Sequence, residues 1–110
     1  MNDIAQTPEP PYYAAIFSSL RTGTDAEAYG EMATRMFDLA KKQPGYLGVE
    51  SAASNTGLGI TVSYWKSRED IERWKAQADH QLAQRQGREK WYSRYALRIA
   101  LVESARDFCR

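Results

Sequence analysis

The chain has 110 residues, a length at which a protein builds one hydrophobic core and not two. Apolar residues make up 43% of it and charged residues 26%, a composition that excludes a disordered chain. Its 15 Lys and Arg nearly balance 14 Asp and Glu, for a formal net charge of +1. Binding to nucleic acid or to an anionic membrane requires a positive excess that this chain lacks, so we expect neither partner.

The inventory of reactive side chains is small. Cys109 is the single cysteine, so one chain can form neither a disulfide nor a cysteine metal site, and a reducing compartment suits it. His80 is the single histidine, and any Ser-His-Asp triad would depend on it. The sequence opens without a basic and apolar leader and has no apolar run long enough to span a bilayer. These features predict a cytoplasmic protein without a metal site.

The chain divides into three parts. Residues 1–11 contain three prolines and predict a flexible N-terminal segment. The folded domain is expected over residues 12–105, followed by a tail over residues 106–110. The first strand of the domain is predicted at Tyr12–Leu20, which is apolar on both faces and ends at a turn-like Thr-Gly-Thr sequence.

A helix is predicted after this strand, capped by Asp25 and extending to about Gln43. Its apolar residues recur at helical spacing, and Pro44 and Gly45 stop it. Two strands are then expected at residues 46–53 and 58–66, paired antiparallel through an Asn-Thr-Gly turn.

The C-terminal half predicts a second helix and a fourth strand. Ser67 and Asp70 form a capping box that opens a helix ending near Gly87. Residues 88–92 predict a short helical turn, and residues 95–103 a strand that is again apolar on both faces. The order βαββαβ predicts an α+β fold in which two helices cover one face of a four-stranded antiparallel sheet. The other apolar face is left uncovered, so we expect a homodimer whose sheets pack face to face.

The sequence from Val62 to Ser67 (VSYWKS), followed by Ile71 and Trp74, resembles the antibiotic biosynthesis monooxygenase family. The turn at residues 43–48 and the Trp91-Tyr92 pair are similar to the same group. This resemblance covers nearly the whole predicted domain. It implies a ferredoxin-like fold that forms a dimeric α/β barrel.

The resemblance also implies an activity. Some members of the family are cofactor-independent oxygenases that let the substrate's own carbanion or phenolate react with oxygen. The implied function is monooxygenation, without metal, flavin or other cofactor, of a small planar aromatic or quinol-type molecule held between sheet and helices. A non-catalytic dimer that binds a small ligand is the first alternative. Haem binding or degradation is the second; of the three residues typical of that branch, Trp74 matches the tryptophan, whereas Phe17-Ser18 and Gln84 stand at the asparagine and histidine positions.

Four residues are candidate catalytic groups. Trp74 would shape the pocket, His80 would accept a proton or position a phenol, and Tyr92 with Arg98 would stabilise an oxyanion. In an unbroken helix His80 would lie opposite the apolar stripe, towards solvent, whereas a new helical segment starting at Asp79 would bring it to the pocket. Arg98 could instead form a structural salt bridge with a carboxylate across the dimer interface.

Five further residues are candidate substrate-binding groups. Aromatic rings can stack on a planar ligand, while serine and amide side chains can bind its oxygens. The aromatic residues could equally be part of the core. These candidates are Ser18, Trp65, Gln84, Trp91 and Tyr95.

Overall fold

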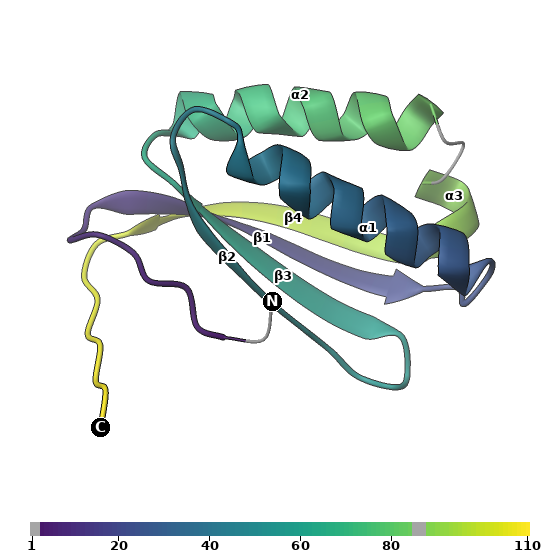
Figure 1. Cartoon of the computed structure of the whole chain (residues 1–110), viewed down its shortest axis with the longest axis horizontal. Coiled ribbons are helices and arrows are strands. Elements are labelled where there is room, and N and C mark those ends of the chain that lie inside the picture. The colour runs from purple at the N-terminus through teal and green to yellow at the C-terminus, as the bar shows by residue number, and fades with distance from the viewer. Residues whose placement is uncertain (1–2, 85–87) are drawn as a thin grey trace.

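The computed structural model describes residues 3–84 and 88–110, with the side chains of residues 80–84, 88 and 89 outside the description. Figure 1 shows two long helices packed on one side of a twisted sheet. The elements are β1 (Tyr12–Arg21), α1 (Ala26–Lys41), β2 (Tyr46–Ala53), β3 (Leu58–Trp65), α2 (Arg68–Gln84), α3 (Arg88–Trp91) and β4 (Tyr92–Val102).

The four strands form one antiparallel sheet in the order β2-β3-β1-β4. β1 lies in the middle, where Tyr13 is opposite Trp65 of β3 and Leu101 of β4. The predicted ferredoxin-like fold, with a four-stranded antiparallel sheet and both long helices on one face, is therefore confirmed (Figure 1).

The fourth strand begins earlier than predicted, at Tyr92 instead of Tyr95. Arg21 pairs with Tyr92 beyond a shift in register, and the backbone N–H of Thr22 donates to the carbonyl of Trp91 at 2.9 Å. Pairing with β1 therefore draws the residues before Tyr95 into the sheet, an effect that local sequence does not report.

The start of α2 follows the predicted capping box. The Ser67 hydroxyl donates to the Asp70 carboxylate at 2.9 Å and accepts from the Asp70 backbone N–H at 3.2 Å. α2 then runs as one continuous helix through Asp79, so the alternative of a new helical segment starting there is wrong. No glycine or proline interrupts residues 71–84, and an aspartate alone does not end a helix.

The core lies at one end of the space between sheet and helices. Trp65 is fully buried and packs with Ala15 and Ile71. Trp74 stacks on it, with ring centroids 6.1 Å apart and planes 24° apart, and the Tyr46 ring meets it edge-on. This packing fixes the position of α2 over β1 and β3.

The face of the sheet away from the helices, called the open face below, is covered at one end by the chain's own N-terminal segment. There the Ala5 backbone N–H donates to the Glu50 carboxylate at 2.9 Å, and the Thr7 and Tyr12 hydroxyls share a hydrogen bond of 2.8 Å. Figure 1 shows this segment on the side of the sheet opposite the helices. The other end is bare, with three large apolar side chains between 42% and 44% exposed: Leu20, Leu58 and Ile60.

Candidate functional site

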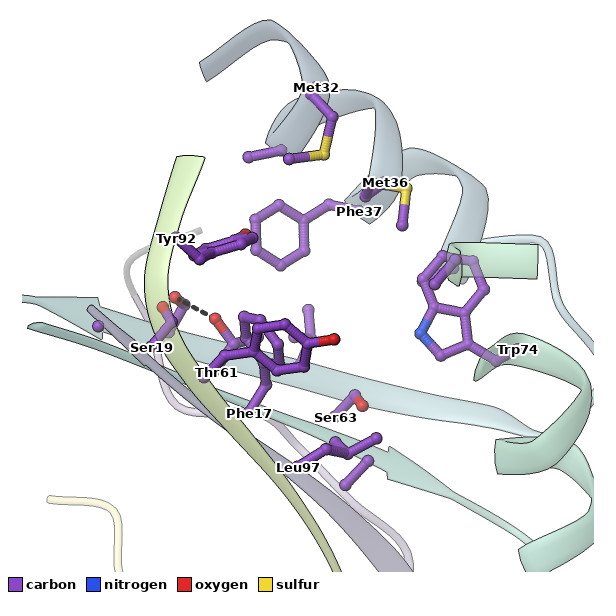
Figure 2. Close-up of a pocket in the computed structure, with 18 of the residues that line it drawn as sticks. Phe17, Ser19, Met32, Met36, Phe37, Thr61, Ser63, Trp74, Tyr92 and Leu97 are labelled. Atoms are coloured by element: carbon purple, nitrogen blue, oxygen red, sulfur yellow. Dashed lines mark hydrogen bonds between the residues drawn. The ribbon is translucent and has the colours of Figure 1, made fainter. Parts of the chain in front are cut away.

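A cavity of about 380 Å³ lies between the sheet and the two long helices, beyond the tryptophan-rich core. All four strands and both long helices contribute to its lining. Figure 2 shows the side chains arranged around an open centre, with α1 on one side and the sheet on the other.

The walls of the cavity are apolar. α1 contributes Met32, Met36 and Phe37, and α2 contributes Trp74 (Figure 2). These α1 residues follow the helical repeat that marked one apolar stripe in the sequence. A flat aromatic ligand would find ring faces and flexible thioethers here, both of which adapt well to planar molecules.

The floor carries a row of small hydroxyl groups, from Ser19, Ser51, Thr61 and Ser63. They line the same face because side chains alternate along each strand and the register sets the strands side by side. Ser51 and Thr61 hydrogen-bond each other at 2.9 Å, and Ser63 accepts from the indole of Trp65 at 2.9 Å. Ser19 is 6% exposed, and the described residues offer its hydroxyl no partner.

One end of the cavity is built from tyrosines. The Tyr92 hydroxyl donates to that of Tyr29 over 3.4 Å, and the Phe17 ring contacts Tyr92 and Tyr95 at centroid distances of 5.5 and 5.4 Å. Burial, and then the hydrogen bond to Tyr29, raise the pKa of Tyr92 far above its ordinary value of 10. At neutral pH Tyr92 is therefore a hydrogen-bond donor and not a base.

Charged side chains lie at two places on the lining. At the tyrosine end, the Arg21 guanidinium carbon is 3.8 Å from the centroid of the Tyr29 ring, a cation–π contact. On α2, Lys75 and Asp79 are exposed and form part of the rim.

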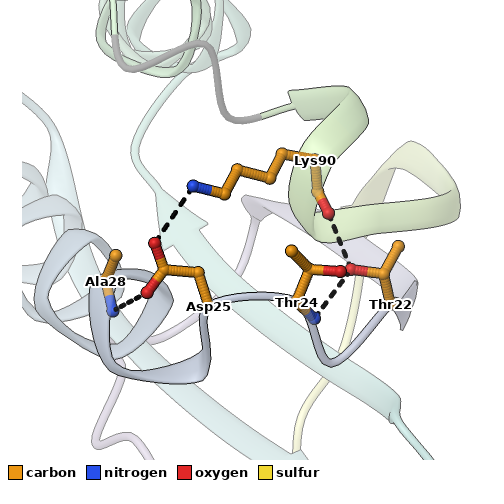
Figure 3. Close-up of polar contacts among 5 residues, drawn as sticks. All are labelled: Thr22, Thr24, Asp25, Ala28 and Lys90. Atoms are coloured by element: carbon orange, nitrogen blue, oxygen red, sulfur yellow. Dashed lines mark hydrogen bonds and ion pairs between the residues drawn. The ribbon is translucent and has the colours of Figure 1, made fainter.

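A set of polar contacts holds the tyrosine end in place (Figure 3). The Thr22 hydroxyl donates to the carbonyl of Lys90 at 2.6 Å, and the Lys90 ammonium pairs with Asp25 at 3.0 Å. Asp25 also caps α1 by accepting from the Ala28 N–H at 3.3 Å. Because Tyr92 follows α3 directly, these contacts, called the corner clamp below, position its ring against α1.

Three of the residues predicted from sequence line the cavity: Trp74, Tyr92 and Tyr95. Two others are part of the core. Trp65 lies buried against Trp74, and Trp91 is buried with its ring edge-on to Tyr29 at 5.9 Å. The rings of these two residues pack against the lining residues Trp74 and Tyr29.

Two predicted residues lie on the wrong side of the sheet. Ser18 pairs with Ile60 and Arg98 with Ile16, positions that alternate away from the helices and do not line the cavity. Arg98 is exposed and has no ion pair within the described part of the chain, and it does not line the cavity in which the oxyanion role was predicted. A salt bridge to a carboxylate across the dimer interface stays a prediction. The neighbouring Ser19 faces the cavity instead.

Two predictions fall outside the described side chains. The structure places His80 and Gln84 on α2 by their backbone, and their side chains are not described.

Other lining residues were not predicted from the sequence. The hydroxyls of Ser51, Thr61 and Ser63 can be recognised as part of one site only when the strand register, which sets them in one row, is known.

Among the described residues of 3–84 and 88–110, no three His, Cys, Asp or Glu side chains gather where they could hold a metal ion. In the same residues, no helix combines the length and the apolar character needed to cross a membrane.

Comparison with known proteins decides the family, since the model of the antibiotic biosynthesis monooxygenase family matches residues 11–86. The chain belongs to this family. The uncharacterised protein YqjZ of Bacillus subtilis is 51% identical over 108 residues, which cover 98% of this chain and 94% of that protein.

Solved structures of other proteins show the same fold. The cofactor-independent oxygenase SnoaB from Streptomyces nogalater is similar with a TM-score of 0.65 and 13% identity, covering 92% of this chain and all of that one. Protein SO0527 from Shewanella oneidensis matches with a TM-score of 0.71 and 12% identity, covering 91% of this chain and all of that one.

Proposed function

We propose that this family member is a cofactor-independent monooxygenase that oxidises a small planar aromatic or quinol-type molecule in the cavity. The observation that carries the proposal is the cavity itself, with apolar walls of ring and thioether groups and a floor of hydroxyls. Such a site stacks on the faces of a flat ring and orients the oxygen atoms of the ligand by hydrogen bonds. The description of SnoaB as a cofactor-independent oxygenase supports the same chemistry.

The substrate itself supplies the electrons in this reaction. A ring methylene loses a proton to give a carbanion or enolate, which reacts with O2. One oxygen atom becomes a ring carbonyl and the other leaves as water with the two methylene hydrogens. The two C–H bonds that are broken supply the four electrons that O2 accepts, so no external reductant is needed.

The lining residues supply orientation and a dry site. Trp74 stacks on the ring, and the neutral hydroxyl of Tyr92, which donates to Tyr29 over 3.4 Å, turns its proton to the substrate oxygen that gains negative charge. His80 was predicted to be the proton acceptor, but the unbroken course of α2 argues against this role, and the His80→Ala variant tests it.

The protein acts as a homodimer in this proposal. Leu20, Leu58 and Ile60 form an exposed apolar patch on the open face, and a second sheet packed there would remove it from water.

Oxygen uptake with anthrone, followed by the absorbance of anthraquinone, tests the proposed activity. We expect turnover by the wild type, a loss of at least tenfold in Trp74→Ala, and unchanged turnover in Arg68→Ala, an exposed position on α2 outside the lining. A loss of the same size in His80→Ala would establish His80 as the proton acceptor. Unchanged turnover in both test variants would remove these residues from the mechanism.

A non-catalytic ligand-binding dimer is the second candidate. The cavity supports it, because apolar walls and a floor of hydroxyls account for binding of a planar molecule without any chemical step. Calorimetric binding of anthrone without oxygen uptake would establish this candidate, and absence of binding would exclude both. Haem lacks comparable support, since Phe17 and not an asparagine lines the cavity from β1; a Soret shift on titration with haem would restore it.

A further inference from the structure

The tyrosine end of the cavity holds hydrogen-bond donors that the protein leaves without acceptors. Ser19 is 94% buried, its side chain lines the cavity, and its hydroxyl has no partner in the described part of the chain. Because this hydroxyl opens onto the cavity, it can donate to an acceptor on a bound ligand.

Space is reserved beside this hydroxyl. Gly59 lies directly across from Ser19 on β3, and a Cβ at that position would stand 3.8 Å from the Ser19 oxygen. Any larger side chain at this place would extend into the cavity above Ser19. The glycine therefore keeps a notch open into which a small polar group of a ligand fits.

A cation stands next to the notch. Arg21 follows Ser19 by two positions on the same face of β1, so their Cα atoms are about 7 Å apart. Its guanidinium rests on the Tyr29 ring and makes no ion pair within the described residues. The ring holds the cation in place without using its N–H donors, as a preorganised anion site requires.

A third donor comes from Tyr29. Its hydroxyl oxygen accepts the hydrogen bond from Tyr92, so its own proton remains available to a ligand. The acidic side chain of the lining, Asp79, is exposed on α2 together with Lys75, so the rim adds one charge of each sign. The donor end itself is positive.

We propose that Ser19, Arg21 and Tyr29 form an anion subsite that binds a carboxylate carried by the aromatic substrate. This inference rests on the proposed function and narrows its substrate class to planar aromatic acids. A carboxylate has two oxygens, so one can take the guanidinium fork while the other reaches a neighbouring hydroxyl. A phenolate offers one oxygen and would leave part of this donor set unused.

Calorimetry with a matched pair of probes tests the subsite, using 1-hydroxy-2-naphthoate and its uncharged amide. We expect the wild type to bind the carboxylate at least tenfold more tightly than the amide. Arg21→Met should remove that preference while leaving the affinity for the amide unchanged, and Ser19→Ala should weaken carboxylate binding by about threefold or more. Arg68→Met, which removes a charge outside the lining, is the control and should keep the preference.

The outcomes separate this inference from the function on which it rests. Equal wild-type affinity for the two probes, or an Arg21→Met variant that keeps the preference, overturns the anion subsite alone. If neither probe binds, the aromatic-binding cavity fails as well. Should Arg21→Met not fold, Arg21→Lys replaces it: a reduced preference with normal amide binding supports the subsite, and an unchanged preference overturns it.

Discussion

Tyr64 and Tyr92 lie on opposite faces of the same sheet, and both stay protonated well into alkaline solution. For Tyr64, burial and a 2.6 Å hydrogen bond to the Glu50 carboxylate raise the pKa. For Tyr92, burial and the contact with Tyr29 have the same effect. In the unfolded chain both hydroxyls would ionise near pH 10. The folded state therefore holds protons that the unfolded state releases.

The stability of the protein should depend on these protons. Both pKa values are higher in the folded state, so the contribution is complete below pH 10 and is lost progressively as the pH rises above it. We expect the free energy of unfolding to fall between pH 9 and pH 11, and to fall less steeply in the Tyr64→Phe/Tyr92→Phe double variant. Urea denaturation at several pH values measures both slopes, and equal slopes would contradict the prediction.

Gly45 is required by its position between α1 and β2. Its φ is +82°, and a Cβ there would overlap the carboxylate of Asp70, which caps α2. Gly45→Ala should destabilise the fold by about 3 kcal/mol, through backbone strain and displacement of this cap. Thermal and urea denaturation give the value.

Two other glycines serve as controls for Gly45. Gly23 has a similar φ of +81° but open space around it, so Gly23→Ala should cost only the backbone strain, about 1 kcal/mol. Gly30 lies within α1 with nothing close, and Gly30→Ala should stabilise the protein by about 0.5–1 kcal/mol. A cost at Gly45 no greater than that at Gly23 would show that the Asp70 contact is unimportant.

Among the elements, the short helix α3 positions one end of the site. Through the corner clamp it joins the end of β1 to the start of α1, and it delivers Tyr92 to the cavity (Figure 3). The Asp25 carboxylate makes two contacts in this clamp, because it caps α1 and also pairs with Lys90. The hydrogen bond from Lys90, and then that from Ala28, lower the pKa of its carboxyl group.

The corner clamp should weaken in acid. Because the folded pKa of Asp25 is lowered, its contribution is present above the ordinary value of 3.8 and is lost as the pH falls through the folded pKa. Asp25→Asn keeps a capping oxygen but lacks the titrating charge, so its melting temperature should fall less between pH 5 and pH 3 than that of the wild type. A parallel decline of the two proteins would rule out this role.

The sequence predicted elements better than it predicted the site. Periodicity, the Ser67–Asp70 box and the Pro44-Gly45 stop are local signals, and the structure confirms the elements that they mark. The side of the sheet on which a residue lies depends on register, and a shift of one position reverses it. For this reason the sequence predicts Ser18 as the substrate-binding serine, whereas in the structure Ser19 faces the cavity.

Arg98 shows the same limit on β4. It stands in an apolar strand, which suggested burial and a partner, but the face to which it alternates is the one without helices. The hydroxyl row of the floor has no local signal, because it is assembled from three strands, of which β1 is distant in sequence from the β2–β3 hairpin. Composition does indicate the tyrosine-rich character of the cavity, yet tertiary packing decides which aromatic residues line it.

At the scale of the whole molecule, the open face is an apolar surface that a single chain leaves partly exposed to water. Its bare end carries Leu20, Leu58 and Ile60 in neighbouring positions of β1 and β3. A charge placed among them would remain desolvated if a second sheet packed on it, at a cost of several kcal/mol.

Ile60→Glu should therefore halve the molar mass of the protein in solution. Light scattering after size-exclusion chromatography measures the mass of the wild type, expected to be that of a dimer, and of the variant. Thr34→Glu, which adds the same charge on the exposed side of α1, should leave the dimer intact. A wild-type monomer, or a dimer that survives Ile60→Glu, would contradict the face-to-face arrangement.

The N-terminal segment has a geometric consequence for such an assembly. It occupies the end of the open face near Tyr12, through the contacts of Ala5 and Thr7, while the patch around Ile60 lies towards the other end of the same strands. Two copies cannot superpose their sheets over the full strand length, because each brings its own layer of chain to one end. In the proposed dimer the twofold axis would then pass near the bare end, and the path of residues 3–11 would set the offset between the two subunits.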